Sequence, residues 1–418
     1  MKRKFLPLIA ILITVSLLII SCDALPFNIS MDSPAQEEIA NEGLDEDSAP
    51  AESTIEEIAD PSGSLVPAGA FVNTQDGMGL SYVNAAGQLI TELKTPGIAS
   101  ADSKEVHVAG TIPSGPIYTP LVYRSWDPQQ AIMINVNDTI TTLRKSDGFF
   151  AMSGAPGQSA IAFSEVQMDG DEPHSYLYAG NTDNLGDVSA FFDLIDAPTY
   201  MALMPVGVEA LANQPQSVWY TKSAWGIGGV DLIFPITRGL YRFDLTSGDN
   251  IQYLDPEKSF QGISPDFSTA GWVDFEPSGD RALQVMKLAA GQVTSFQLDP
   301  SSDRGAGFVV FSPDNQYAAW LEASGSMVSE PLNFQARVRA GYIPNGGIVN
   351  EVNLDTASQF MPSGSAAMMK PVGWLDNMTV LIECHGQDWN ETNLLTLDIA
   401  SGQMALFAAG SFSGFTYQ

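Results

Sequence analysis

The sequence predicts an all-β fold, built from short repeated strands, for residues 67–418. Runs of four to eight residues rich in Val, Ile, Tyr, Phe and Trp alternate with clusters of Gly, Pro, Asn, Asp and Ser, for example at Leu121–Trp126 and Ser217–Thr221. No long stretch keeps the spacing of apolar residues that an amphipathic helix needs. Two short motifs recur along this part of the chain, and such recurrence indicates a repeating architecture.

Residues 1–21 have the pattern of a secretion signal. Three basic residues, Lys2–Lys4, precede the apolar stretch Phe5–Ile20, and the small residue Ser21 precedes Cys22. The stretch is at the lower limit of the length that spans a bilayer, about 20 apolar residues, so an uncleaved membrane anchor is the alternative. A cleaved signal is favoured because no basic cluster follows the stretch and the next cation is Lys94.

The segment Ile19–Cys22 resembles the lipobox of bacterial lipoproteins, with an aliphatic residue three positions before the cysteine and a small residue just before it. It departs from that pattern at Ile20, where a small residue is more usual. The resemblance implies cleavage before Cys22 and a diacylglyceryl thioether on its sulfur. Two or more acyl chains hold a protein stably on a membrane. We therefore expect a lipoprotein of the cell envelope that faces the extracytoplasmic side.

The composition of residues 22–66 predicts a disordered acidic tether. From residue 23 to residue 66 the chain has twelve acidic residues, no basic residue and only one aromatic residue, Phe27. Such a segment cannot bury enough apolar surface to offset the entropy of ordering it. It would hold the folded domain, residues 67–418, away from the membrane.

The charge balance is strongly acidic. The chain has 18 basic and 49 acidic residues and a formal net charge of −31, and loss of the three basic residues of the signal makes it −34. This balance argues against a nucleic-acid partner and against adsorption on anionic lipid, because both need cationic patches.

The chain has two cysteines. Lipidation of Cys22 would leave Cys384 alone, so no disulfide within the chain is expected. Cys384 follows the apolar run Val380–Ile382 and Glu383. We interpret it as a buried strand residue rather than as a nucleophile.

The first recurring motif is an alternating strand followed by an Asp and a Ser-Gly turn. It occurs at Leu240–Gly248 and Leu394–Gly402, and weaker copies of its turn occur at Ala85–Gln88 and Ala289–Gln292. In the second motif an apolar residue ends one strand, a tight turn with Pro or Asp follows, and a new strand begins. Its copies are Phe311–Trp320, Ile263–Trp272, Phe275–Gly279 and Trp374–Asn377.

The second motif resembles the Ser-Pro-Asp-Gly repeats of TolB-like and WD40-like β-propellers, and the first resembles the strand that follows in the same blade. The resemblance implies a β-propeller over residues 67–418. Units that begin near residues 70, 118, 149, 200, 261, 306 and 368 give seven blades, with six or eight as alternatives. The copies at Ile263 and Phe275 are too close for successive blades of about 40 residues, so one of them is a coincidence.

The sequence has no recognisable catalytic constellation. His107, His174 and His385 do not form the His-Glu-x-x-His pattern of zinc peptidases. A Gly-x-Ser-x-Gly turn is also absent, as are a phosphate-binding loop and a dinucleotide fingerprint. We expect the histidines to be surface or partnered core residues, and we expect that the protein is not an enzyme.

No cofactor is indicated by the motifs. Asp169, Asp171 and Glu172 are the candidate metal ligands, because carboxylate oxygens suit Ca²⁺. They lack the spacing of an EF-hand loop, and acidic turns are common in so acidic a chain. A solvated turn is therefore the favoured interpretation.

The tryptophans divide into two groups. Trp272 and Trp320 occupy the same offset in two copies of the second motif, which predicts packing between blades, and Trp374 is grouped with them. The others lie beside turn residues and are candidates for ligand contact, with packing under a loop as the alternative. These candidates are Trp126, Trp225 and Trp389.

Three functions are consistent with these features. The first is a binding module for a protein, a peptide or a glycan. The second is a propeller enzyme, lyase-like or glycosidase-like, with catalytic groups around the channel mouth. The third is a passive structural lipoprotein of the envelope. A propeller pattern without a recognisable catalytic set favours the first.

Overall fold

The computed structural model describes residues 65–74, 79–94, 105–108, 121–125, 131–136, 139–146, 148–170, 172–195, 201–225, 233–274, 281–329, 333–387 and 391–417. The first strand begins at Pro67. Residues 1–64, which include the predicted signal, Cys22 and nearly all of the predicted tether, lie outside the described residues. The domain boundaries therefore remain predictions.

Seven four-stranded antiparallel sheets make up the fold, as the sequence predicted. From the innermost strand outward, the first sheet contains β28 (Ser411–Tyr417), β1 (Pro67–Asn73), β2 (Gly79–Asn84) and β3 (Leu89–Lys94). The second contains β4 (Glu105–Val108), β5 (Leu121–Ser125), β6 (Ala131–Val136) and β7 (Thr139–Lys145), and the third contains β8 (Phe149–Gly154), β9 (Ala160–Asp169), β10 (Glu172–Asn181) and β11 (Phe192–Ile195).

The remaining sheets follow the same order. The fourth contains β12 (Met201–Leu211), β13 (Gln214–Ala224), β14 (Thr237–Asp244) and β15 (Asn250–Leu254), and the fifth contains β16 (Lys258–Ile263), β17 (Thr269–Asp274), β18 (Ala282–Lys287) and β19 (Gln292–Gln297). The sixth contains β20 (Gly305–Phe311), β21 (Tyr317–Ser324), β22 (Gln335–Tyr342) and β23 (Gly347–Asn353), and the seventh contains β24 (Ala366–Trp374), β25 (Thr379–Gly386), β26 (Thr392–Asp398) and β27 (Met404–Ala409).

Six of the seven predicted blade starts lie within a few residues of the first strand of a sheet. The exception is the second blade, expected near residue 118, whose first strand is β4 at Glu105–Val108. A strand of four residues is too short to give a clear alternating pattern in the sequence. The predicted start of this blade therefore fell close to β5, its second strand. A short helix, α2 (Leu354–Ser358), links the sixth sheet to the seventh and is capped by Asn353, whose side chain accepts from the Thr356 amide.

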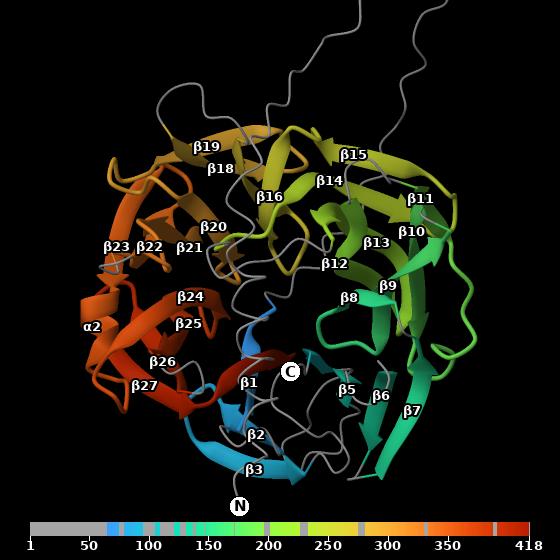
Figure 1. Ribbon diagram of the computed structural model, residues 1–418, viewed down its shortest axis with the longest axis horizontal. Helices are drawn as coiled ribbons and strands as arrows, with labels where there is room; N and C mark the ends of the chain where they lie inside the picture. Colours follow the sequence, from blue (N-terminus) through green and yellow to red (C-terminus); the bar gives the residue numbers. More distant parts are fainter. Residues whose placement is uncertain are drawn as a thin grey trace, which may run out of the picture. The chain divides into compact units, whose positions relative to one another are not determined.

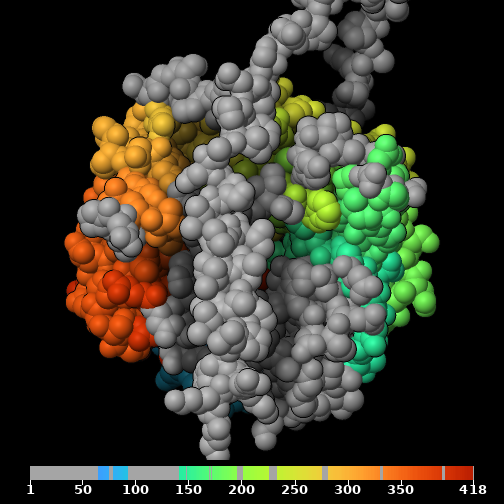
Figure 2. Space-filling model, viewed as in Figure 1, coloured from blue at the N-terminus to red at the C-terminus, as the bar shows by residue number. Residues whose placement is uncertain are grey.

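The sheets form a closed ring. The innermost strands of successive sheets contact one another in order, from β4 through β8, β12, β16 and β20 to β24, and β28 contacts β4. Figure 1 shows the sheets arranged around one axis. Figure 2 shows the described sheets in space-filling form, following one another around the rim in sequence order. The fold is therefore a seven-bladed β-propeller.

Hydrogen bonds between distant parts of the chain close the ring. β1 pairs antiparallel with β28, so Ala70 lies opposite Phe415, and the first sheet contains both N-terminal and C-terminal strands (Figure 1). Ala70 and Val83 of this sheet pack with Leu381 and Leu394 of the seventh sheet. Strands near residues 70–90 therefore lie directly beside those of residues 368–407, as a closed ring requires.

The recurring motifs form the turns at one end of the sheets. The first motif connects the third strand to the fourth, and its glycines have positive φ angles, 79° at Gly248 and 73° at Gly402, a conformation that suits glycine. The second motif connects the first strand to the second at Ser264, Ser312 and Trp374. The copy near Phe275 lies between β17 and β18, outside the described residues, and is therefore the one out of place in the repeat.

The antiparallel order gives the ring two distinct ends. We call the end that carries both motifs the turn face. The opposite end, the loop face, carries the links between second and third strands and the links between sheets.

Innermost strands share a local irregularity. Six of the seven have a register shift in mid-strand, which leaves residues such as Gln261, Phe308 and Val372 outside the regular pairing. Bulges of this kind bend a strand and redirect a side chain. After the bulge in β16 comes Gly262, where a Cβ atom would collide with the backbone of Val309 in the next sheet. Glycine thus lets neighbouring sheets approach closely.

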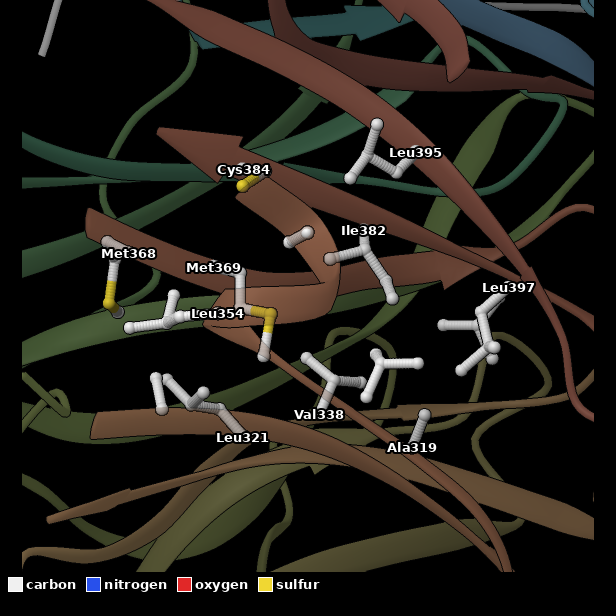
Figure 3. Packing of buried hydrophobic residues seen from close by; sticks show 14 of the residues in the cluster. Ala319, Leu321, Val338, Leu354, Met368, Met369, Ile382, Cys384, Leu395 and Leu397 are labelled. Atoms are coloured by element: carbon white, nitrogen blue, oxygen red, sulfur yellow. The ribbon is translucent and has the colours of Figure 1, made fainter. Parts of the chain in front are cut away.

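The cores lie between neighbouring sheets. Figure 3 shows Leu321 and Val338 of the sixth sheet facing Met369, Ile382 and Leu395 of the seventh. Trp272, Trp320 and Trp374 are buried in such clusters, as predicted. Cys384 is also fully buried in β25, as predicted, and its burial raises the pKa of the thiol to about 12.

Candidate functional site

The three tryptophans predicted to contact a ligand all lie in links between the second and third strands of a sheet. Trp225 directly follows β13 in the link to β14 and is half-buried. Trp126 and Trp389 lie outside the described residues, in the β5–β6 and β25–β26 links. All three links join a second strand to a third and belong to the loop face. Their ligand contacts remain predictions.

The acidic tetrad Asp169–Glu172, which holds the three candidate Ca²⁺ ligands, lies in a fourth link of this class. Asp169 ends β9 and pairs with Glu172, the exposed first residue of β10, while Asp171 lies outside the described residues. Within the described ranges, no three His, Cys, Asp or Glu side chains gather closely enough to hold a metal ion. Binding of Ca²⁺ to this tetrad remains a prediction.

A cluster that was not predicted lies on the first three strands of the seventh sheet. We call Lys370, Glu383, His385 and Thr392 the axial cluster. Strand alternation places Glu383 and His385 on one face of β25, and the register places Lys370 of β24 opposite Glu383. Lys370 Nζ and His385 Nε2 each lie 3.0 Å from Glu383 Oε1, and His385 Nδ1 lies 3.1 Å from Thr392 Oγ1.

Glu383 is the buried centre of the axial cluster. Its second oxygen, Oε2, accepts a 2.7 Å hydrogen bond from the backbone amide of Phe412, in the closing strand β28. Burial alone would raise the pKa of Glu383. The hydrogen bond with His385, the positive charge of Lys370 and the Phe412 amide outweigh burial and lower this pKa to about 2. The carboxylate is therefore ionised at neutral pH and fully occupied by its partners.

Lys370 reaches from the seventh sheet to the sixth. Its ammonium lies 5.8 Å from the centre of the Phe308 ring, and the side chain is 34% exposed. An ammonium group has three N–H donors, and one is directed to Glu383. Among the described residues the ammonium has no second ion-pair partner, so the other two donors can serve an acceptor from outside the chain, next to an aromatic ring that favours a cation.

Phe308 forms an aromatic pair with Phe234. Both residues are half-buried, and their ring centres lie 5.9 Å apart. Phe308 lies in the bulge of β20 and has a φ angle of 53°. Among the described residues, it is the only non-glycine residue inside a strand with a positive φ. Such a conformation costs on the order of 1–3 kcal/mol and is found most often at functional sites.

Gln261 adjoins the aromatic pair from the fifth sheet. A Cβ atom at Gly307 would collide with both Gln261 Oε1 and the Phe234 ring, so these two groups lie next to each other. Gln261 is 8% exposed, and its amide donates to Ser259 Oγ at 2.9 Å. Its oxygen has no donor within the described part of the chain. An unsatisfied buried acceptor costs about 1–3 kcal/mol, so this oxygen favours a donor from water or a ligand.

The sequence contained a signal for the axial cluster. Two ionisable residues, Glu383 and His385, alternate within the otherwise apolar run of β25, and buried ionisable residues are rare unless they are paired. The expectation for His385, a partnered residue, agrees with the contacts of both its ring nitrogens. Neither Lys370 nor Phe308 could be placed beside it without the strand register and the bulge.

Comparisons with known proteins show the fold. The sequence matches no protein-family model, and a search of curated proteins found no match. The structure is similar to that of a prolyl endopeptidase, with a TM-score of 0.52 and 10% identity over 84% of this chain and 51% of that one. The chain therefore spans about half the length of that enzyme.

Two further solved structures are similar to the chain at lower TM-scores. TolB from Acinetobacter baumannii has a TM-score of 0.39 and 14% identity, over 68% of this chain and 62% of that one. Oligogalacturonate lyase from Vibrio parahaemolyticus has a TM-score of 0.46 and 10% identity, over 84% of this chain and 92% of that one. Identities this low carry no information about activity.

From the missing motifs we expected that the chain is not an enzyme, and this expectation was wrong. The prolyl endopeptidase, an enzyme by name, shares the fold of this chain, so the fold and the absence of familiar patterns do not exclude catalysis. The physical reason is that a ring brings together groups from separate sheets, as it does here with Lys370 and Phe308. Such groups leave no contiguous motif in the sequence. This similarity does not establish an activity for the chain.

Within the described ranges, no helix has the length and apolar character needed to cross a membrane.

Proposed function

We propose that this protein is a lipid-anchored binding module of the cell envelope, whose propeller binds a protein, peptide or glycan ligand at the inner edge of the ring. The observation that carries the proposal is the partly exposed side chain of Lys370, whose ammonium has N–H donors that Glu383 does not use and lies beside the Phe234–Phe308 pair. Binding sites typically combine apolar or aromatic walls with a few placed polar groups, and this site has both.

The loop face supports the same function. Its links between second and third strands carry Trp126, Trp225 and Trp389 in the sequence, and aromatic residues on links held by a rigid frame often contact ligands. The acidic composition of the chain disfavours nucleic acid and anionic lipid as partners.

Binding is tested with the full-length mature chain on peptide and glycan arrays. We expect a retained ligand whose affinity falls at least tenfold in a Lys370→Gln variant. Lys258→Gln is the matched control, because Lys258 also lies on an innermost strand and forms an exposed pair with Asp274. Binding that is unaffected by Lys370→Gln would contradict the proposed site. Mass analysis of the recovered ligand distinguishes simple binding from turnover.

The anchor rests on the signal pattern and the lipobox-like segment before Cys22. With residues 22–66 as a tether, lipidation would place the propeller away from an envelope membrane on its extracytoplasmic side. Mass spectrometry of the mature protein from a bacterial host should find Cys22 as the first residue, with a diacylglyceryl thioether. In a Cys22→Ser control the lipid mass should be absent. A wild-type chain that still starts at an unmodified Met1 would refute the anchor.

A further inference from the structure

We infer that the site formed by Lys370, Phe308, Phe234 and Gln261 captures the C-terminal residue of a peptide that ends in an apolar side chain and a free carboxylate. This inference rests on the proposed binding function and names its ligand class. The four residues come from the seventh, sixth, fourth and fifth sheets or their links, and the closed ring alone brings them together.

The site offers three kinds of interaction. Lys370 has two N–H donors that Glu383 does not use, and a carboxylate can accept both. Phe234 and Phe308 present two half-buried rings inclined by 47°, which form an angular apolar wall. Gln261 Oε1 is a buried acceptor that has no donor among the described residues and lies next to the Phe234 ring.

The last residue of a peptide carries the matching groups: a carboxylate, an apolar side chain and one amide N–H. Capture of a C-terminal carboxylate is a recurring mode of peptide recognition. An acidic sugar also has a carboxylate, but it presents a broad flat ring face and many hydroxyl groups. Two inclined rings and one buried acceptor fit a compact side chain and a single amide better. The peptide is therefore the ligand that the geometry favours.

Phe308 supplies an independent reason to expect a bound ligand. Its left-handed backbone conformation is unfavourable for a large side chain, and the structure nevertheless holds its ring against Phe234 and within reach of Lys370. Glycine at this position would relieve the backbone while removing the ring. The relief of backbone strain in Phe308→Gly offsets part of the stability lost with the ring, which packs against a core cluster.

The test measures fluorescence anisotropy of labelled hexapeptides with the full-length mature protein. The peptides share a Gly-Ser sequence and end in Leu, Phe, Asp or Lys, each as a free acid and as a C-terminal amide. We expect the Leu and Phe acids to bind, and their amides to bind at least tenfold more weakly. In Lys370→Gln the difference between acid and amide should disappear, because the group that senses the carboxylate is gone.

Phe308→Gly should weaken binding of the Leu and Phe acids at least tenfold, and because the Phe308 ring also packs against a core cluster, a circular-dichroism melt must show that the variant is folded at the temperature of the assay. The matched control is Phe267→Gly, since Phe267 also has a positive φ, 57°, but lies in a turn of the turn face. This control should bind as the wild type does.

Two results would overturn the inference. One is equal binding of acid and amide by the wild-type protein. The other is binding of a hexuronate oligosaccharide, lost in Lys370→Gln, without binding of any peptide; this would refute the peptide assignment but leave the binding function intact. Failure of both ligand classes to bind would count against the binding function as well.

Discussion

At the scale of single residues, Glu383 shows how one buried charge can serve the whole ring. Its two oxygens contact Lys370, His385 and the Phe412 amide, so one carboxylate connects β24, β25 and the closing strand β28. A buried carboxylate is stable only with such partners, and removal of a partner leaves an uncompensated charge. The ionised form of Glu383 therefore stabilises the closed ring.

This stabilisation should depend on pH. Because folding lowers the pKa of Glu383 from 4.5 to about 2, its contribution is fully present above about pH 4.5 and is lost as the pH falls toward 2. The contribution at neutral pH is on the order of 3 kcal/mol. Urea unfolding at pH 7 and pH 3 should show that Glu383→Gln reduces stability at pH 7 and much less at pH 3.

Many other carboxylates also titrate in this range, so a matched variant is needed. Asp274→Asn removes the carboxylate of the exposed Lys258–Asp274 pair, and exposed pairs contribute little to stability. Its effect should be small at both pH values. An effect of Glu383→Gln that is equal at pH 7 and pH 3 would show that ionisation of Glu383 does not stabilise the ring.

At the scale of strands and sheets, the close approach between neighbouring innermost strands limits which residues are tolerated. At Gly262 an added Cβ would collide with the backbone of Val309, which cannot rotate away as a side chain can. Gly262→Ala should therefore destabilise the protein by about 2–3 kcal/mol, the cost of overpacking. Thermal unfolding followed by circular dichroism measures this change.

Gly248→Ala is the comparison that separates crowding from backbone strain. Gly248 has a φ of 79°, but an added Cβ would meet nothing within 4 Å. Its cost should be that of strain alone, about 1 kcal/mol. If Gly262→Ala costs no more than Gly248→Ala, the close approach of the fifth and sixth sheets does not limit stability.

At the scale of the whole molecule, the closed ring predicts cooperative unfolding. Deletion of residues 411–418 removes β28, exposes the hydrogen-bonding edge of β1 and uncovers apolar residues such as Ala70 and Leu381. We expect the entire domain to unfold, because every sheet depends on its neighbours. The same reasoning applies to a deletion of residues 368–418. An open solenoid would lose one unit and keep the rest.

Circular-dichroism melts of the deletion variant decide the question. A peptide with the sequence of residues 411–418, added in excess, should restore part of the folded signal by pairing with β1. A scrambled peptide of the same composition is the control. A truncated chain that melts near the wild-type temperature would exclude a closed ring.

The sequence predicted the number of sheets better than it predicted the site, for a physical reason. Turns such as Asp398–Gly402 depend on local chemistry: Asp398 accepts from the Ser401 amide, and Gly402 takes a positive φ. Such chemistry can be read within a few residues. The axial cluster depends instead on pairing between β24 and β25, and the contact of Lys370 with Phe308 depends on a bulge in β20. No local pattern encodes that contact.

The pairing of β1 with β28 also has a consequence for protein synthesis. The first sheet lacks its innermost strand until residues 411–417 have left the ribosome. At 5–20 residues per second, this comes roughly 15 seconds to a minute after β3 has been made. During that time β1 has an unpaired edge that can pair wrongly with another chain. A translation stop just before residue 411 would leave six complete sheets but an open ring. The ring can therefore close only after the last strand of the propeller, β28, has been made.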